Sequence, residues 1–471
     1  MADPEMIENR TFDEIEVGAT ARVSRTLTEE DIQLFARVSG DVNPAHLDAA
    51  YAATDMFHRV IAHGMWGGGL ISAVLGTELP GPGAIYLGQS LRFVRPVSLG
   101  DTVTATVTVV EKRPEHRVVI LDCACTNQKG EEVITGRAEV KAPTEKVRRP
   151  RIPVPEVRIA GHGRYRRLIE RAQAAEAPLT AVAHPCTAAA LDAALEAAEA
   201  GLIRPILVGP EAKIRAAAEA AGKDISGYRL VAAPHSHAAA AAAVALVRSG
   251  GAALLMKGSL HTDELMSAVV ASDGGLRTER RISHAYLMDV PGHPTPLIIT
   301  DAAINIEPTL EQKADIVRNG IDLAHAIGID APKVAILAAV ETVNPGMRST
   351  LDAAALCKMA DRGQIAGGVL DGPLAFDNAV SEAAAREKGI VSPVAGRADI
   401  LVVPNLEAGN MLAKQLTFLS GADAAGVVLG ARVPIILTSR ADNLRTRLAS
   451  CAIAALLVRA ASETALGTIK E

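Results

Sequence analysis

The sequence has few cysteines, little net charge and no long apolar run. Five cysteines in 471 residues are too few for a disulfide framework and indicate reduced thiols in a cytosolic protein. The 48 basic and 54 acidic residues leave a net charge of −6, which argues against the basic face of a nucleic-acid-binding protein. The alanine-rich apolar run at 238–247 is far shorter than the roughly 18 residues of a membrane span. The polar, acidic start MADPEMIENR does not resemble a signal peptide.

Apolar residues, in contrast, are plentiful. They make up 49% of the chain, which is enough for several buried cores. At roughly 150 residues per domain, the length predicts about three folding units. We therefore expect a multidomain globular protein in the cytoplasm, with no nucleic-acid or membrane partner.

A proline-rich, basic segment divides the chain. Residues 141–163 contain four prolines, and proline fixes its own φ and cannot donate to a β-ladder. We therefore predict an extended linker at 146–160 between a domain at 1–145 and a domain at 161–471. Its arginines at 148, 149 and 151 are typical of a solvated linker, and binding of an acidic group is the alternative.

The two sides of this segment differ in their hydrophobic pattern. Before it, residues 102–109 alternate apolar and polar side chains with the period of a half-buried strand, and 118–126 and 132–140 are further strands. After it, short apolar runs alternate with alanine-rich helical stretches, which is typical of a parallel sheet covered by helices on both faces. These runs lie at 205–208, 253–256, 334–337, 400–403 and 434–437. Thr309 with Gln312 forms a capping box and predicts a helix start.

The first candidate site is the segment SGDVNPAHLD at 39–48. Asn43 followed by Pro44 is a favourable cap and first residue for a short helix that would carry His46. The positive end of the helix dipole favours a neutral imidazole, and Asp41 comes just before the cap. A carboxylate and a neutral imidazole on one loop can hold a water as a general acid–base pair. Taken singly, each residue is better explained as a cap or as a hydrogen-bonded structural group, whereas the pair together with Gly64 favours catalysis.

An apolar helix is predicted next, over 61–76, with Gly64 at its start and Gly67, Gly68 and Gly69 in its first turns. Each of these glycines costs a helix interior roughly 1 kcal/mol relative to alanine. We therefore expect another backbone or a ligand to come close to the helix there. A free N–H at Gly64 is suited to bind a developing oxyanion.

Metal binding is not expected in this region. Cys123 and Cys125 alternate along a predicted strand, so both side chains face the same side, which we take to be the core. No matching Cys/His pair lies nearby, which argues against zinc. His63, just before the glycine-rich helix, is assigned no role.

Residues of about 11–142 resemble the MaoC-like, (R)-specific enoyl-CoA hydratases. The GDVNPAHLD loop, the IAHGM helix start and the LRFVRPVSLGDTVT strand pair carry the resemblance. It implies a hot-dog fold, in which an antiparallel sheet wraps a long apolar helix. It also implies that Asp41 and His46 activate water for addition to a trans-2-enoyl-CoA, that the Gly64 N–H holds the thioester oxygen, and that Asn43 contacts the substrate. The product would be a (3R)-3-hydroxyacyl-CoA.

The region after 160 lacks both a GxxxxGK[ST] loop and a GxGxxG fingerprint after a strand, so its α/β pattern alone does not indicate ATP or NAD. Polar clusters follow the predicted strands, at the ends where doubly wound sheets place ligands. These clusters lie at 254–262, 299–309, 369–381, 402–410 and 434–442.

The last cluster carries the most chemistry, because the strand PIIL leads directly to Ser439, Arg440 and Asp442. Arginine clamps phosphate bidentately, and a serine hydroxyl can donate to a thiolate or a carbonyl oxygen. Asp442 could accept a proton or orient Arg440, and an ordinary structural ion pair is the alternative. Lys257 and Asp377 are weaker candidates for substrate contact.

From about residue 164 to the end, the chain resembles the phosphate acetyl/butyryltransferase family. The strings TDAAINIEPTLEQK, DGPLAFDNAVSEAAAREKGI, VAGRADILVVPNLEAGNMLAKQL and TSRAD carry this resemblance. It implies two α/β/α lobes around a cleft, at 161–300 plus 437–471 and at 301–436, and acyl transfer between CoA and inorganic phosphate. Ser439 and Arg440 match the family's pair beside the thiol and the phosphate. Asp442 comes earlier than the base of phosphate acetyltransferases, a pattern of the butyryltransferase-like branch, so the acyl group and the base stay open.

Together these observations predict a fused, bifunctional CoA-thioester enzyme. Its ligands would be enoyl-CoA, acyl-CoA and inorganic phosphate, with no metal and no tightly bound cofactor. By analogy with other hot-dog folds we expect a homo-oligomer. The alternative is an active hydratase whose C-terminal domain senses CoA esters or mediates oligomerisation without catalysis.

Overall fold

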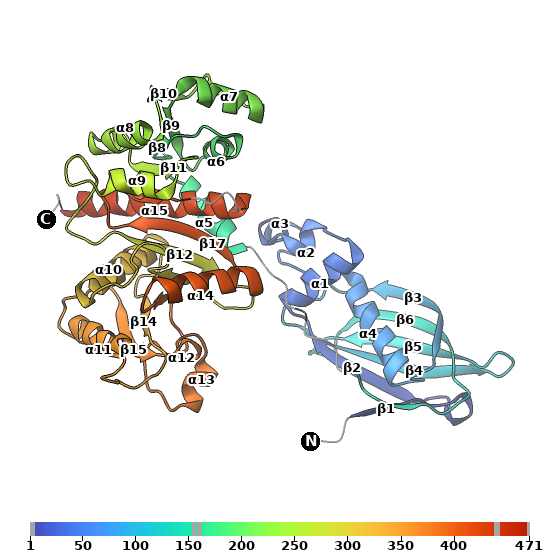
Figure 1. Ribbon diagram of the computed structural model, residues 1–471. Coiled ribbons are helices and arrows are strands. Elements are labelled where there is room, and N and C mark those ends of the chain that lie inside the picture. Colours follow the sequence, from blue (N-terminus) through green and yellow to red (C-terminus); the bar gives the residue numbers. More distant parts are fainter. Residues whose placement is uncertain (1–4, 153–156, 158–162, 438–442, 469–471) are drawn as a thin grey trace. The chain divides into compact units, whose positions relative to one another are not determined.

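The computed structural model describes residues 5–152, 157, 163–437 and 443–468. Its contacts divide the chain into two compact units, Met1–Ile159 and Ala160–Glu471, each with its own elements (Figure 1). Among the described helices, none is both long and apolar enough to cross a membrane.

The first unit is a five-stranded antiparallel sheet wrapped around the helix α4 (Gly64–Thr77) (Figure 1). Residues of β4 alternate between buried and half-buried from 102 to 110, as the period-2 pattern predicts, and the buried side contributes to the core around α4. This arrangement confirms the expected hot-dog fold. In sheet order the strands are β2 (Thr20–Thr26), β4 (Thr102–Arg113), β5 (Val118–Thr126), β6 (Glu132–Lys141) and β3 (Ile85–Phe93).

Short elements surround this sheet. They are β1 (Met6–Glu8), the 3-10 helix Phe12–Glu14, α1 (Glu29–Ser39), α2 (Pro44–Leu47), α3 (Ala49–Thr54) and β7 (Arg148–Pro150). The strand β7 pairs antiparallel with β1, and Arg151 forms ion pairs with Glu5 and Glu78, both at 3.2 Å. The arginine cluster is therefore a strand attached to the first unit, where the sequence predicted a solvated linker.

The second unit is built on one mixed sheet of eleven strands. Its order is β10-β9-β8-β11-β18-β17-β12-β13-β16-β14-β15. The strands are β8 (Leu179–Ala183), β9 (Arg204–Gly209), β10 (Arg229–Ala232), β11 (Leu254–Lys257), β12 (Ser283–Asp289), β13 (Leu297–Thr300), β14 (Lys333–Leu337), β15 (Val369–Leu374), β16 (Ile400–Val402), β17 (Asp423–Leu429) and β18 (Ile435–Ile436). The five apolar runs predicted from the sequence fall in β9, β11, β14, β16 and β18.

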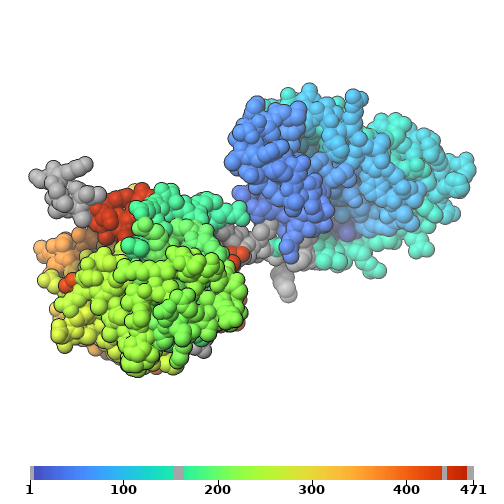
Figure 2. Space-filling view, turned by 90° about the horizontal axis from the view of Figure 1, so that it is seen from above, coloured from blue at the N-terminus to red at the C-terminus, as the bar shows by residue number. Residues whose placement is uncertain are grey.

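Helices cover this sheet, and in Figure 2 the green surface of the second unit comes from the helices that follow β8 to β11. The helices are α5 (Gly163–Gln173), α6 (Ala188–Glu199), α7 (Glu211–Ala221), α8 (Ser236–Arg248), α9 (Thr262–Val269), α10 (Leu310–Ala326), α11 (Arg348–Asp361), α12 (Phe376–Val380), α13 (Glu382–Glu387), α14 (Leu406–Leu419) and α15 (Leu444–Thr468). The helix α15 returns to the start of the unit and contacts α5 and α6.

The two halves of the sheet run in opposite directions. β8 to β11 and β18 are parallel to one another, and so are β13 to β16. Three antiparallel pairs lie between the two sets: β18 with β17, β17 with β12, and β12 with β13. Three reversals of strand direction separate the two sets, so the carboxyl ends of their strands point in opposite directions. They lie at opposite edges of the sheet, where an edge is a row of strand ends.

Candidate active sites

The loop between α1 and α2 carries the first predicted pair. Helix α1 ends at Gly40, whose φ of +76° is the left-handed conformation that glycine adopts without strain. The Asn43 carboxamide oxygen accepts the Ala45 N–H at 3.1 Å, which confirms the predicted cap of α2. The Asp41 carboxylate accepts the Asn43 N–H at 3.1 Å. The exposed Asp41 side chain is thereby held next to the first turn of α2.

His46 is half-buried, and one of its ring nitrogens is already hydrogen-bonded. Its Nδ1 lies 2.9 Å from the carbonyl oxygen of Ile61. Because a carbonyl oxygen only accepts, the proton of a neutral ring must reside on Nδ1. The Nε2 lone pair is left to accept a proton from another group.

His63 is part of the same cluster, although no role was predicted for it from the sequence. It is 3% exposed, its Nε2 lies 3.0 Å from the carbonyl oxygen of Asp41, and its ring centroid is 4.0 Å from that of His46. Its Nδ1 is buried without a partner in the described residues. His63 thus supports both predicted residues from the start of α4. Its place directly before Gly64 was the available signal in the sequence.

The polar atoms of this cluster are close enough to share a water. One potential ligand atom from each of Asp41, His46 and His63 lies within 4.8 Å of the others. Two atoms at that separation can both contact one water, since each hydrogen bond spans about 2.8 Å. One nitrogen of each histidine is hydrogen-bonded to a backbone carbonyl, so the other nitrogen of each neutral ring carries a lone pair.

A cavity of about 270 Å³ adjoins the cluster. His46, His63 and Gly64 line it together with the apolar side chains of Phe57, Trp66, Phe93 and Ile134. Gly64 is the first residue of α4, where backbone N–H groups have no acceptor within the helix. The cavity is therefore lined by apolar side chains, by the two histidine rings and by a backbone N–H donor at Gly64.

The glycines of α4 make room for side chains of the sheet. A Cβ on Gly64 would lie 2.9 Å from the Phe93 ring, and one on Gly67 would lie 2.4 Å from Ile134 Cδ1. A Cβ on Gly69 would meet no atom within 4 Å. Side chains of the sheet, rather than another backbone, therefore fill the space beside Gly64 and Gly67 in the described residues, and the approach of a ligand to this helix stays a prediction.

Cys123 and Cys125 lie in the core of the first unit, as predicted. Burial raises the pKa of Cys123 to about 11 and that of Cys125 to about 12. Both groups are therefore neutral thiols at physiological pH, and neither has the thiolate character of a nucleophile or a metal ligand.

In the second unit, the predicted residues Ser439, Arg440 and Asp442 lie outside the described residues. The strand that precedes them is described. β18 runs parallel to β11, with Ile436 beside Met256. Lys257, the last residue of β11, is half-buried, and its Nζ lies 3.5 Å and 3.4 Å from two backbone carbonyl oxygens of the following turn. Lys257 therefore lies at the edge of the sheet where β18 ends.

Asp377 is not brought to that edge. It is an exposed residue of α12, which follows β15 at the far end of the sheet. Seven strand positions separate β15 from β11, which corresponds to roughly 30 Å at about 4.8 Å per strand. The topology therefore separates Asp377 from Lys257, and substrate contact by either residue stays a prediction.

The strings TDAAIN and EAGN meet at the opposite edge of the sheet. The buried Asp301 carboxylate accepts three backbone N–H groups of the turn that follows it, at 2.9, 3.0 and 3.1 Å. A Cβ on Gly409 would lie 2.7 Å from the carbonyl oxygen of Asp301, and Asn410 Nδ2 donates to the carbonyl of Ala302 at 3.2 Å. These residues fasten the start of α14 to the end of β13.

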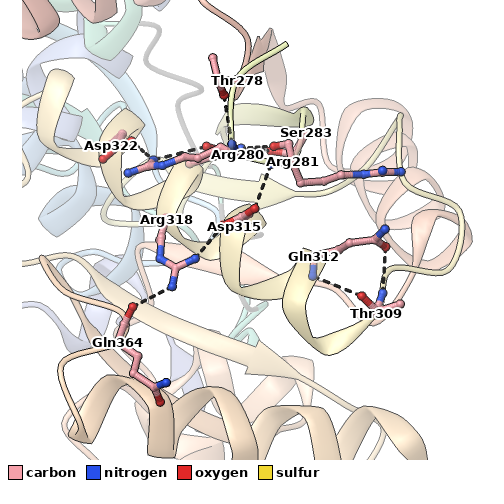
Figure 3. Close-up of polar contacts among 11 residues, drawn as sticks. Thr278, Arg280, Arg281, Ser283, Thr309, Gln312, Asp315, Arg318, Asp322 and Gln364 are labelled. Carbon is pink, nitrogen blue, oxygen red and sulfur yellow. Dashed lines mark hydrogen bonds and ion pairs between the residues drawn. The ribbon is translucent and has the colours of Figure 1, made fainter. Parts of the chain in front are cut away.

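A polar network continues along the same edge (Figure 3). The Arg281 N–H donates to the Asp315 carboxylate at 2.9 Å, and Arg318 pairs with Asp315 at 2.6 Å. The Thr309 hydroxyl accepts the Gln312 N–H at 3.3 Å, and the Gln312 side chain accepts the Thr309 N–H at 3.0 Å. The predicted capping box is thus confirmed as the start of α10.

Comparisons with known proteins match the two units separately. Residues 12–123 match the family model described as a MaoC like domain, and residues 236–455 match the model described as phosphate acetyl/butaryl transferase. The second unit is similar to a phosphate acetyltransferase of Rhizobium meliloti, 68% identical over 293 residues that cover 62% of this chain and 93% of the relative. A phosphate butyryltransferase of Clostridium acetobutylicum is 42% identical over 293 residues, covering 62% of this chain and 97% of the relative. The unliganded R-hydratase PhaJ1 of Pseudomonas aeruginosa is 49% identical, covers 33% of this chain and 99% of its own, and has a TM-score of 0.32.

Proposed function

Because the chain belongs to the phosphate acetyl/butyryl transferase family and also carries a MaoC-like domain, we propose that it is a bifunctional enzyme acting on CoA thioesters. The first unit hydrates a trans-2-enoyl-CoA to a (3R)-3-hydroxyacyl-CoA. The second unit moves an acyl group reversibly between CoA and inorganic phosphate. The 68% identity to a phosphate acetyltransferase, over almost all of that relative, carries the proposal for the second unit.

The geometry around Asp41 and His46 supports the hydratase activity. His46 Nε2 accepts a proton from a water that Asp41 also binds, and the water oxygen adds to the β-carbon of the enoyl thioester. Negative charge then develops on the thioester oxygen, which the Gly64 N–H stabilises until His46 passes the proton taken from the water to the α-carbon. The apolar lining of the adjoining cavity suits the acyl chain. Asn43 keeps the loop in shape as the cap of α2, and its contact with the substrate is part of the proposal.

In the second unit, the roles of Ser439, Arg440 and Asp442 follow from their match to the family. Arg440 binds the phosphate that accepts or releases the acyl group, Ser439 donates to the reacting oxygen or sulfur, and Asp442 orients Arg440. Lys257, at the end of the neighbouring strand β11, adds positive charge for the phosphate groups of the substrates. The reaction needs positioning and charge stabilisation rather than a covalent enzyme intermediate.

Acetyl is the acyl group we propose for this transfer. The acetyltransferase relative is 68% identical, against 42% for the butyryltransferase relative, over stretches of the same length. The early Asp442, which the sequence analysis associated with the butyryltransferase-like branch, is then compatible with acetyl transfer. CoA thioesters and phosphate are substrates in this scheme, and the enzyme needs no tightly bound cofactor. The cytoplasm is the location that we propose for it.

The first unit also supports assembly into a homo-oligomer. Among the described strands, β3 lies at the edge of its sheet and pairs only with β6, and it exposes Ile85, Leu87 and Phe93, each by more than half. An exposed apolar edge strand is a template for pairing with another chain. Phe93 also lines the candidate cavity, so a second copy on this strand would border the site. Light scattering of the purified protein tests this, and a monomeric mass would contradict it.

The test of the proposed function uses the purified full-length protein with crotonyl-CoA, and separately with acetyl-CoA or butyryl-CoA plus phosphate. Loss of the enoyl absorbance reports hydration, and phosphate-dependent release of free thiol reports acyl transfer. We expect both activities, with acetyl-CoA the better substrate for transfer. Hydration without transfer would leave the second unit as a sensor of CoA esters or an oligomerisation module.

A further inference from the structure

His184 lies at the carboxyl end of β8, next to the strands that lead to the predicted transfer residues. The residue before it, Ala183, is paired with Lys257 across the β8–β11 ladder, and Met256 is paired with Ile436 across the β11–β18 ladder. β8 and β18 are therefore two strand positions apart, which corresponds to about 10 Å. An acyl phosphate and a thiol fit within that distance.

The backbone at His184 is held in an uncommon conformation. Its φ is +57°, and among the described residues of the second unit the other positive-φ positions are all glycines. The His184 N–H donates to Val208 at 2.7 Å, which fixes the turn to the neighbouring strand. Non-glycine residues in the left-handed region are costly and cluster where function requires them.

The Ser259 hydroxyl determines which ring nitrogen of His184 carries the proton. Ser259 Oγ donates its single proton to the carbonyl oxygen of His184 at 2.8 Å. It therefore accepts at its two other contacts, from His184 Nδ1 at 3.1 Å and from the Cys186 N–H at 3.3 Å. Nδ1 is protonated as a result, and Nε2 presents a lone pair for which no partner is recorded in the described residues.

The surroundings also keep the His184 ring neutral. Partial burial lowers its pKa from the usual value of 6.5, the nearby Lys213 lowers it further, and Glu264 opposes both. A neutral imidazole with one locked nitrogen and one free lone pair is the form that can accept a proton at physiological pH.

We propose that His184 is the general base of the acyl-transfer site, a role that rests on the proposed function of the second unit. His184 Nε2 takes the proton from the CoA thiol, and the sulfur attacks the carbonyl carbon of the acyl phosphate. The carbon–sulfur bond forms as the carbon–oxygen bond to phosphate breaks, and the phosphate leaves with the bonding electron pair. The proton then passes through solvent from His184 to the released phosphate, and the reverse reaction returns it to the sulfur.

The test compares two replacements of His184 in the full-length protein. Asparagine tolerates the left-handed conformation and can still donate to Ser259, so His184→Asn keeps the turn and removes the base. We expect kcat for acyl-CoA formation to fall by about 10²- to 10⁴-fold, the usual contribution of general-base catalysis. His184→Gly also fits the backbone and leaves a space of imidazole size, so added imidazole should restore activity.

A matched control is His235→Asn. His235 caps α8 by accepting the Ala238 N–H, and asparagine is a preferred residue for this role, so transfer should be unchanged. Wild-type protein without phosphate-dependent transfer would overturn the proposed function and not only this inference. If the wild type is active and the kcat of His184→Asn lies within about threefold of the wild-type kcat, the change is far smaller than the usual effect of losing a base. That result would overturn the role of His184 and leave the proposed function in place. An inactive His184→Gly that added imidazole does not restore would show that the missing ring is not what the reaction needs as a base, which also overturns the proposal.

Discussion

At the scale of single residues, both proposed mechanisms use a histidine with one nitrogen fixed by an oxygen acceptor. Ile61 fixes Nδ1 of His46, and Ser259 fixes Nδ1 of His184. In each case Nε2 is the nitrogen that can take part in proton transfer. The chemistry of these residues therefore depends on neighbours that are distant in the sequence.

Two substitutions should separate the activities. Asp41→Asn keeps the cap contacts of the loop but removes the carboxylate that binds water, so hydration should be lost while acyl transfer continues. Arg440→Ala removes the phosphate clamp, so transfer should be lost while hydration continues. Crotonyl-CoA hydration and phosphate-dependent thiol release are measured on both variants. A hydration rate of Asp41→Asn within about threefold of wild type would contradict the general acid–base assignment.

His63→Leu tests whether His63 positions the pair. Leucine is similar in size and removes the hydrogen bond to the carbonyl of Asp41, so the loop should lose its alignment with His46. We expect kcat for hydration to fall roughly 10²-fold, as misplacement by about 1 Å can cause, with a small change in KM. Stability should be retained, because the change also removes a buried nitrogen without a partner.

His116→Leu is the control for His63→Leu, because His116 is exposed in the turn between β4 and β5. Equal hydration rates for the two variants would show that His63 does not position the catalytic loop.

At the scale of elements, α4 shows that glycines in one helix serve different purposes. Gly67 leaves room for Ile134 of the sheet, whereas Gly69 is exposed and faces open space. The composition of the helix alone does not distinguish these positions, because both lie in its first turns.

Gly69→Ala should therefore stabilise the first unit by about 1 kcal/mol, the difference in helix propensity between the two residues. Gly67→Ala should bring no such gain, because the new Cβ would lie 2.4 Å from Ile134 Cδ1. Urea unfolding followed by fluorescence of Trp66, the single tryptophan, reports on this helix. A gain in stability in both variants would show that Ile134 moves aside for the new Cβ at little cost.

β12 carries a buried histidine that makes the second unit sensitive to acid. Burial lowers the pKa of His284 from 6.5 to about 4, and the nearby Asp301 opposes this shift. The folded state therefore binds this proton less readily than the unfolded state. Stability is fully present above the unfolded pKa and decreases as the pH falls from about 6.5 toward 4, by up to about 1.4 kcal/mol per pH unit.

Comparison with His284→Asn isolates this contribution from the titration of other groups. Urea unfolding of the second unit is followed by circular dichroism across that pH range, because the single tryptophan lies in the first unit. The variant should lose stability with acid less steeply than the wild type. Identical slopes would contradict the assignment to His284.

At the scale of the whole molecule, the chain consists of two units with separate cores. β7 belongs to the first unit, and α5 opens the second. Each unit contains the elements of its own candidate site, and neither set of described site residues draws on the other unit.

Cleavage at a protease site inserted between 152 and 163 should therefore leave both activities in place. Since independent domains keep their own cores, we expect each rate within about twofold of the intact protein. Rates are measured before and after complete cleavage, and an uncleaved sample treated with inactive protease is the control. Loss of either activity on cleavage would show that its site depends on the other unit.

The sequence was informative wherever the deciding interactions span only a few residues. The alternation of β4, the Asn43 cap, the capping box of α10 and the closeness of Asp41 to His46 were all predicted correctly. The family resemblances added the hot-dog fold of the first unit and the transferase family of the second. Ser439, Arg440 and Asp442 stay predictions, because they lie outside the described residues.

Only the tertiary structure decided which distant residues meet. It brought His63 to Asp41 across 22 positions and His184 to Ser259 across 75, and it separated Asp377 from Lys257. It also assigned the space beside Gly64 and Gly67 of α4 to side chains of the sheet. Local hydrogen bonds and side-chain periodicity depend on neighbours within one or two turns, so a sequence displays them directly. Strand order and direction depend on how all the elements pack at once, and no short segment contains that information.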